Sequence, residues 1–514
     1  MSDFGTASVD FSTEKFMNTK RVNITPALVL AAALALSLGA CGRTPGSGTG
    51  ASEVPYKIVM PLLTRGSLPD LPKVQAELNR YLKDRNLEVE FLPLSYAAMQ
   101  NQLNLMITGG EKLDVMPVLS ATFSNDVAQG KLIDLNDLLK TRGAATAAAV
   151  GNEYLKAGTV DGKIYGIPSL RDMAAGYGIC MRKDILDKYG FRTEDIKTIE
   201  DISRLFTAVS AGEKDMYMTF GQGNTISIVN QLMVDWDGLG DNFGVLMNHG
   251  QDAELKVVNL FATKEYENKL RIIRDWYRKG WIIPDAATNT EPATRLVGAG
   301  QLFSFCANLK PGFDKQSTLG AGGVEMVTAD IMPAFSTTTQ VGIMCWTIPI
   351  TCKNPERTMD FLNLLFTDPA VVNFIDWGIE GTHYVKLNDY VIGYPPGINA
   401  SGTGYNMNLS WFYGNSLIGY VWEGNPPDTN RQMIAFNKNA IVSKALGFQF
   451  DAIPVRTAIA AVQNAAGQYR LSLEYGMVDV DSALPRFIKA LEDAGIGQII
   501  AEKQRQLDRW LDRN

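Results

Sequence analysis

The side chains with the clearest chemical use are aromatic rings that stand beside planar polar groups. Asp235 and Trp236 are adjacent in the chain, and Trp411 opens the aromatic run Trp411-Phe412-Tyr413. Sugars present flat C–H faces rimmed with hydroxyl groups, so their binding sites combine aromatic rings with Asp, Asn or Arg. Carbohydrate binding is therefore the chemistry that these residue types serve best. The alternative for Trp236 is an ordinary core tryptophan under a glycine-rich turn.

Catalytic and metal-binding constellations are scarce in this sequence. His249 and His383 are its two histidines, and neither has a second His, a Cys or a paired carboxylate nearby at ligand spacing. The sequence motifs of α/β-hydrolases, P-loop nucleotide-binding proteins and zinc peptidases are missing. We therefore expect no catalytic residue, no metal ion and no cofactor. A carboxylate pair for glycoside hydrolysis stays open, because spacing in sequence says nothing about spacing in space.

Composition restricts the class of partner. The chain has 514 residues, with 48 Lys and Arg against 55 Asp and Glu, which gives a net charge of −7. That sign disfavours nucleic acid, whose phosphates attract basic surfaces.

The elements that would position a site alternate between strand and helix. Residues 56–63 and 114–119 are apolar runs, residues 87–91 alternate, and the segments between them have helical spacing. This order predicts an α/β fold with a parallel sheet covered by helices. Ligands bind beyond the carboxyl ends of the strands in such sheets, where Arg65 and Ser120 follow the first and third strands. Solvated loop positions are the alternative for both residues.

Later segments add further expectations. Thr198 and Asp201 predict a capping box at the start of a helix, and the chain from Pro454 onward has the pattern of a helical segment. Trp346 lies inside the apolar strand predicted over residues 341–350. Its side chain is expected either to bind the ligand or to be buried in the protein core. The thiols other than Cys41 are expected to be buried and unbridged.

The first tenth of the chain has the pattern of an export signal. Residues 27–40 are almost continuously apolar, carry no charge, follow Lys20-Arg21, and are too few to span a bilayer comfortably. The run Leu38-Gly39-Ala40-Cys41 resembles a bacterial lipobox, which implies that Cys41 is lipidated and becomes the mature N-terminus.

Two further features adjoin this signal. Three acidic residues stand among the first 16 residues, which is unusual before a signal peptide, so we interpret Met17 as the true start. Residues 42–52 are rich in Gly, Ser and Thr, which is typical of a flexible tether.

Motifs spread over nearly the whole remaining chain carry a family resemblance. They are Gly130 to Leu135, Asp161 to Pro168, Met181 to Leu186, Tyr277 to Ile283, Cys352 to Glu356 and Trp377 to Tyr384. In this order they resemble the extracellular solute-binding proteins of ABC importers, of the carbohydrate type, family 1. The segment 461–506 resembles the C-terminal domain of unknown function in the LipO-like lipoproteins of Gram-positive bacteria.

The resemblance implies the two-lobed fold of the periplasmic binding proteins, type II, with hinge crossovers and a helical C-terminal extension. The crossovers are expected near 169–174, near 333–337 and within 383–396. The implied organisation is a signal peptide over 1–40, a lipidated tether over 41–54, lobe 1 from 55–170 plus 334–390, and lobe 2 from 171–333 plus 391–514.

The same resemblance adds residues to the site. It puts Arg171 and Asp172 where the first crossover borders the cleft, Asp235 and Trp236 in the second lobe, and Asn308 after a strand of that lobe. A surface ion pair is the alternative for Arg171 and Asp172, and loop solvation for Asn308. The complete set of expected substrate-binding residues is Arg65, Ser120, Arg171, Asp172, Asp235, Trp236, Asn308, Trp346 and Trp411.

Together these features predict a substrate-binding subunit that captures an oligosaccharide or a modified sugar and delivers it to ABC permease subunits. We expect a monomer, without enzyme activity, held by its lipid alone at the extracellular face of a Gram-positive cell membrane. One alternative is a sensor lipoprotein coupled to a signalling receptor, and another is an extracellular glycan-degrading enzyme. Residue spacing does not identify the ligand.

Overall fold

The computed structural model describes residues 54–221, 225–407 and 409–513 of the chain. The signal peptide and the lipidation expected at Cys41 lie outside these residues. The body from Val54 onward forms one compact unit by its internal contacts.

A first hydrophobic core surrounds strands β1 (Tyr56–Thr64) and β2 (Leu87–Ser95), which pair in parallel as predicted. The helices α1 (Leu71–Leu82) and α2 (Tyr96–Thr108) follow these strands and contact them. The next strand, β3 (Met116–Leu119), does not continue the parallel ladder. It pairs antiparallel with β10 (Met344–Thr347). This strand lies within the one predicted over residues 341–350, but local patterning could not reveal its pairing with so distant a part of the chain.

A second core is built on a sheet with the strand order β14-β9-β7-β8. Its members are β7 (Ala175–Arg182), β8 (Ser304–Leu309), β9 (Met326–Ser336) and β14 (Ile441–Val442). The helices α8 (Ile199–Gly212) and α10 (Lys264–Arg278) supply much of the buried apolar surface. The predicted capping box of Thr198 and Asp201 at the start of α8 is confirmed.

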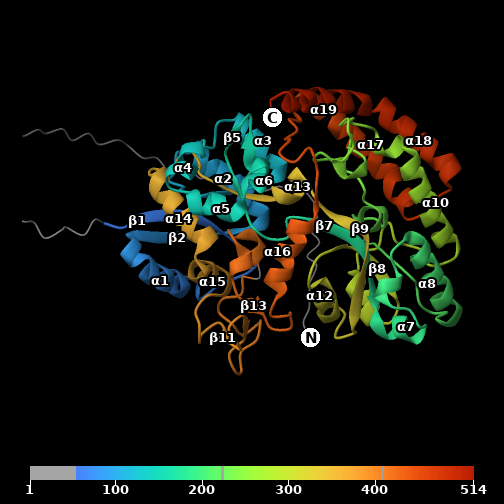
Figure 1. Ribbon diagram of the computed structural model, residues 1–514, viewed down its shortest axis with the longest axis horizontal. Coiled ribbons are helices and arrows are strands. Elements are labelled where there is room, and N and C mark those ends of the chain that lie inside the picture. Colours follow the sequence, from blue (N-terminus) through green and yellow to red (C-terminus); the bar gives the residue numbers. More distant parts are fainter. Residues whose placement is uncertain (1–53, 222–224, 408, 514) are drawn as a thin grey trace, which may run out of the picture. The chain divides into compact units, whose positions relative to one another are not determined.

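The C-terminal helices are α17 (Arg456–Glu474), α18 (Val480–Asp493) and α19 (Ile496–Leu511), which confirms the helical prediction for this segment. Figure 1 shows them beside α10, and all three pack on the second core through Val462, Phe487 and Ile499.

The chain passes between the two cores at several places. The first lies between Met173 and Ile179, and the second between Phe335 and Val341. The third crossing was expected within 383–396. Instead, the chain goes from Tyr413 of the first core to strand β14 of the second sheet, contacts the first core again at Leu446, and rejoins the second core at Val462.

The reason is that residues near 383–396 belong to a small sheet of their own. It consists of β11 (Val385–Lys386), β12 (Val391–Gly393) and β13 (Val421–Trp422). The chain then returns to the first core through Tyr405, Phe412 and Tyr413, which the sequence assigned to lobe 2. The exact lobe boundaries stay a prediction.

The remaining elements complete the two bodies. The helices are α3 (Ser120–Ala128), α4 (Asn136–Thr141), α5 (Ala144–Val150), α6 (Asn152–Leu155), α7 (Lys183–Lys188), α9 (Val229–Leu232), α11 (Ala293–Gly298), α12 (Phe313–Gly320), α13 (Thr338–Val341), α14 (Pro355–Thr367), α15 (Pro369–Trp377) and α16 (Thr429–Asn439). The short strands are β4 (Thr159–Val160), β5 (Lys163–Ile164) and β6 (Ile167–Pro168). Cys180, Cys306 and Cys345 are buried free thiols, whereas Cys352 is only partly buried.

One carboxyl group in the first core has no compensating partner. Asp376 near the end of α15 is buried, and its Oδ1 atom has no hydrogen bond within the described part of the chain. Burial raises the pKa of Asp376 well above its ordinary value. The folded protein therefore holds this proton more tightly than the unfolded chain does.

Replacing Asp376 with Asn should stabilise the protein in a pH-dependent way. A raised folded pKa means that stability falls as pH rises from the unfolded pKa of about 3.9 toward the folded value. The Asp376→Asn variant lacks this loss, so its free energy of unfolding should exceed that of the unmodified protein by a margin that grows above about pH 4. Urea unfolding at several pH values measures it. The exposed Asp389→Asn is the control, and a constant margin would contradict the assignment.

Candidate functional site

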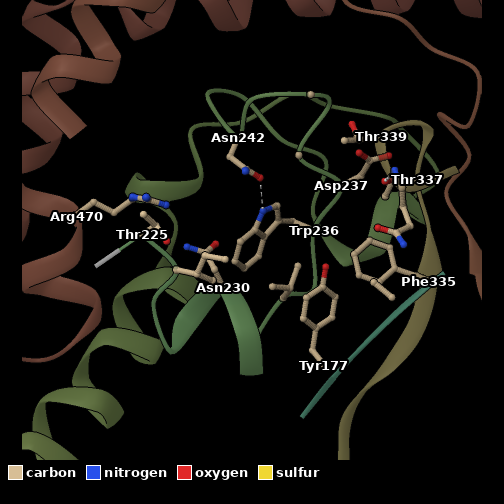
Figure 2. Close-up of a pocket in the computed structure, with 16 residues that line it drawn as sticks. Tyr177, Thr225, Asn230, Trp236, Asp237, Asn242, Phe335, Thr337, Thr339 and Arg470 are labelled. Carbon is tan, nitrogen blue, oxygen red and sulfur yellow. Dashed lines mark hydrogen bonds between the residues drawn. The ribbon is translucent and has the colours of Figure 1, made fainter. Parts of the chain in front are cut away.

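A cavity of about 320 Å³ lies against the second core (Figure 2). The aromatic side chains of Tyr177, Trp236 and Phe335 form part of its wall. Trp236 is only 3% exposed, and its Nε1 donates a hydrogen bond to Asn242 Oδ1 at 2.9 Å. The ring is therefore held in a fixed orientation with a small part of its surface open to the cavity.

The loop that carries Trp236 depends on glycine. A Cβ atom at Gly238 would lie 2.2 Å from Asn242 Oδ1, the acceptor that orients the Trp236 ring. Gly240 has a φ of +102°, which other residues rarely adopt. The glycines of this turn thus allow Asn242 to approach Trp236 closely.

Polar groups complete the wall of this cavity. The hydroxyl of Tyr177 has no hydrogen-bond partner among the described residues, and burial, together with the charge of Asp237, raises the pKa of Tyr177 to about 12. Asp237 is buried, and its carboxylate accepts hydrogen bonds from Ser443 Oγ at 2.6 Å and from Leu239 N at 3.0 Å. Burial raises the pKa of Asp237. Tyr177 therefore offers a protonated hydroxyl that is ready to donate to a ligand.

A second cavity of about 630 Å³ adjoins the first, because Asp237, Gly240 and Thr339 line both. Ser120, predicted as a site residue, lines this second cavity at the start of α3, a helix whose Phe123 belongs to the first core. Gln463 of α17 also lines it. The two cavities together thus have walls that come from both cores.

Arg171 and Asp172 lie at the first crossing, and Trp411 lies beside them, a neighbour that the sequence did not predict. Arg171 lies over the Trp411 ring at 5.3 Å from its centroid and forms an ion pair with Asp172 at 2.5 Å. Lys310 binds the same carboxylate at 3.0 Å. The Nη1 atom of Arg171 is buried without an acceptor in the described residues. This group lines neither of the two cavities.

Other predicted residues lie elsewhere. Asp235 does not line the cavity, because its carboxylate accepts a hydrogen bond from Lys269 at 2.5 Å, and Asp237 takes the place expected for it. Asn308 is partly buried in β8 opposite Tyr177, and Arg65 is exposed after β1; neither lines the two cavities.

Trp346 is part of the first core and not of the site. Its side chain is 0% exposed, and its Nε1 donates to Ser169 Oγ and to the carbonyl of Phe412, each at 3.1 Å. The ring packs against Phe412 and Tyr413. A ring enclosed in this way has no face for a ligand, so the expected role of Trp346 is corrected.

Several residues that line the first cavity were not predicted. They are Tyr177, Asn230, Asn242 and Arg470. The turn glycines gave a signal for Asn242, since they mark a close backbone approach. Nothing in the sequence distinguished Arg470 from the solvent-facing cations of an amphipathic helix.

Two kinds of feature are absent from the described ranges. Within residues 54–221, 225–407 and 409–513, no helix has both the length and the apolar character needed to cross a bilayer. The same part of the chain contains no group of three or more His, Cys, Asp or Glu residues arranged to hold a metal ion.

Comparison with known proteins adds two family matches. A family model described as bacterial extracellular solute-binding protein matches residues 78–385. A second model, described as a domain of unknown function (DUF3502), matches residues 444–512. A carbohydrate ABC transporter substrate-binding protein of Streptococcus pneumoniae serotype 4 is 25% identical over 93% of this chain and 96% of its own length.

Solved structures are similar over most of the chain. An N-glycan transport solute-binding protein from Streptococcus pneumoniae covers 89% of this chain and 99% of its own, at 22% identity and a TM-score of 0.77. The same protein in complex with Man5GlcNAc gives a TM-score of 0.63 with the same coverage and identity. This likeness confirms the predicted two-lobed α/β fold.

The position of Trp346 leads to a test of its structural role. Trp346→Phe keeps a large ring but removes the N–H donor and leaves a small void, so the free energy of unfolding should fall by about 2 kcal/mol. Urea unfolding measures this change. The control is Trp422→Phe, a partly buried ring on the small sheet that has no hydrogen bond to lose in the described residues. Equal effects of the two substitutions would contradict the assignment of Trp346 to the core.

Proposed function

Because the chain belongs to the bacterial extracellular solute-binding proteins, we propose that it is the substrate-binding subunit of an ABC importer for an oligosaccharide or a modified sugar. Its relatives are substrate-binding proteins and not enzymes. The name of the streptococcal relative supports a carbohydrate as the solute.

The observation that carries this proposal is the composition of the cavity wall. Three aromatic rings, of Tyr177, Trp236 and Phe335, stand beside unpaired polar groups such as the Tyr177 hydroxyl. Rings pack on the C–H faces of a sugar while hydroxyls and amides bind its oxygens. The joined cavities also have room for more than a single hexose, since their volumes are about 320 and 630 Å³.

Such a protein needs no bond-breaking chemistry. A solute that contacts Ser120 on one wall and Trp236 on the other binds more tightly when the walls approach, so binding favours a closed arrangement. The permease would then receive the closed complex. The affinity difference between the open and closed states sets how far solute can shift this equilibrium.

We also propose that Arg171 and Trp411 bind solute as the lobes close. The Arg171 guanidinium lies over the Trp411 ring, and its buried Nη1 donor lacks an acceptor in the described residues. An unpaired buried donor costs about 1–3 kcal/mol, which a solute oxygen would relieve. Asp172 would keep this guanidinium in place through its ion pair.

Anchoring by lipid at Cys41 completes the proposal. The lipobox-like run before Cys41 supports a diacylglyceryl anchor, and two acyl chains hold a protein stably on a membrane where one does not. The Gly- and Ser-rich residues that follow would let the body reach the permease.

The Tyr177 hydroxyl gives the sharpest test of the solute site. Isothermal titration with Man5GlcNAc, a fructooligosaccharide and an oligosaccharide ending in glucuronic acid should reveal at least one tight ligand, whereas a tripeptide should not bind. Tyr177→Phe removes one hydrogen bond to the solute and should weaken that ligand about three- to tenfold. The melting temperature of the unliganded protein should stay unchanged, because this hydroxyl has no partner among the described residues.

The matched control is Tyr390→Phe, because Tyr390 is 65% exposed on the small sheet. Tight binding of the tripeptide alone would refute the carbohydrate proposal. Equal affinities of the Tyr177→Phe variant and the unmodified protein would remove Tyr177 from the site.

The anchor has its own test. Cys41→Ala removes the thiol that accepts the lipid, so the protein should move from the membrane fraction to the culture medium. Fractionation followed by immunoblotting measures this shift. Cys352→Ala, which changes a partly buried thiol of the body, is the control and should stay with the membrane. Retention of the Cys41→Ala variant in the membrane fraction would contradict lipidation at Cys41.

A further inference from the structure

The C-terminal helical segment is built into the second core. Val462, Leu473, Phe487 and Ile499 are buried there with residues of the central sheet. This segment is the part of the chain that matches a domain of unknown function, residues 444–512. Any role of that domain is therefore exerted from within the body that carries the first cavity.

The last helix of the segment holds the loop that carries Trp236. Lys503 of α19 has a side chain that is 0% exposed, and it donates hydrogen bonds to Asp241 and, at 3.0 Å, to the carbonyl of Gly244. Asp241 precedes Asn242, the acceptor for the Trp236 indole. Helix α19 thus holds in place the loop that forms part of the cavity wall.

Helix α17 brings a cation to the same cavity. Arg470 lines it and is partly buried, and the close-up shows its guanidinium reaching toward the cavity (Figure 2). The nearest carboxylate along the helix, Glu474, is occupied by other donors. Tyr266 OH donates to its Oε1 at 2.9 Å and Asn230 Nδ2 to its Oε2 at 3.2 Å.

In the described part of the chain, Arg470 has no contact partner of its own, although its charge acts on Glu474 from beyond ion-pair distance and favours the ionised carboxylate. Within the described residues it forms no ion pair and no hydrogen bond. Arg486 of α18 differs, because it is exposed and donates to the carbonyl of Ser482. A guanidinium that is partly removed from water loses hydration, so an acceptor that enters the cavity would bind it favourably.

We propose that Arg470 contacts the bound solute directly and that the domain of unknown function thereby helps to determine which solute binds. This inference rests on the proposed function. A guanidinium presents its N–H donors in a planar fork, which matches two neighbouring oxygen acceptors. These acceptors are either vicinal hydroxyls of a neutral sugar or the carboxylate of an acidic sugar.

Titration calorimetry of an Arg470→Met variant tests the proposal, since Met keeps an apolar stem and removes the donors. The probes are the neutral oligosaccharide that binds tightest among the two named above and the oligosaccharide that ends in glucuronic acid. The affinity should fall about 10- to 100-fold for at least one of them. Arg486→Met is the matched control and should bind as the unmodified protein does.

The two probes show which of the two kinds of acceptor Arg470 binds. A loss for the neutral probe identifies vicinal hydroxyls, and a loss confined to the acidic probe identifies a carboxylate. Unchanged affinity for both probes would overturn the role of Arg470 and leave the proposed function standing. Failure of the unmodified protein to bind any oligosaccharide would instead overturn the proposed function.

A second measurement does not depend on the folding of a variant. Labelling of the unmodified protein with phenylglyoxal, read by peptide mass spectrometry, should modify Arg470 in the absence of sugar. A saturating concentration of the bound oligosaccharide should protect Arg470 and leave the labelling of Arg486 unchanged. Equal labelling of Arg470 with and without the sugar would contradict direct contact.

Discussion

The side-chain amide of Asn437 fixes the place where the chain passes between its two cores. Its Oδ1 accepts a hydrogen bond from Met173 N at 2.8 Å, and its Nδ2 donates to the carbonyl of Arg171 at 2.6 Å. The residue between them, Asp172, uses its own carbonyl to accept from Gln340 of the second crossing at 3.0 Å. A buried donor or acceptor that loses its partner costs about 1–3 kcal/mol, so the two crossings are locked in one register. This register also fixes part of the wall of the first cavity, because Gln340 is one of its lining residues.

The loop around Trp236 is held by contacts from residues far along the chain. Ser443, which follows strand β14, donates to Asp237 at 2.6 Å, and Lys503 of α19 binds Asp241. Buried ion pairs of this kind contribute little net stability, since desolvation of both charges offsets their attraction. Their effect is geometric, because a misplaced loop would leave the Lys503 ammonium group buried without a carboxylate. The position of this part of the cavity wall thus depends on Ser443 and Lys503, which line neither of the two cavities.

Local patterns in the sequence predicted the parts of the fold that depend on neighbours in the chain. The alternation in β2, the helical spacing in α1 and the capping box of α8 are all decided within a few residues. Local patterns could not show that Trp236 lines a cavity whereas Trp346 is enclosed in the first core. The donors and acceptors around Trp346 come from Ser169 and Phe412, each separated from it by many residues. Which of Asp235 and Asp237 lines the cavity could not be predicted either. Asp235 is bound by Lys269 and Asp237 by Ser443, and only tertiary packing brings these partners close.

The place of helix α17 in the chain would couple solute binding by the C-terminal segment to the relative positions of the two cores. After Leu446, the last residue of the chain that is buried in the first core, Phe448 packs with Leu507 of α19, and α17 then begins at Arg456. Helix α17 therefore begins close to the last buried contact of the chain with the first core. Gln463 and Arg470 on this helix line the two adjoining cavities. A solute that binds α17 and the wall at Ser120 would favour the arrangement in which both are within reach, and by linkage that arrangement would bind the solute more tightly. Solute binding by the C-terminal helices and closure of the two cores about the crossing that Asn437 binds would then be governed by the same conformational equilibrium.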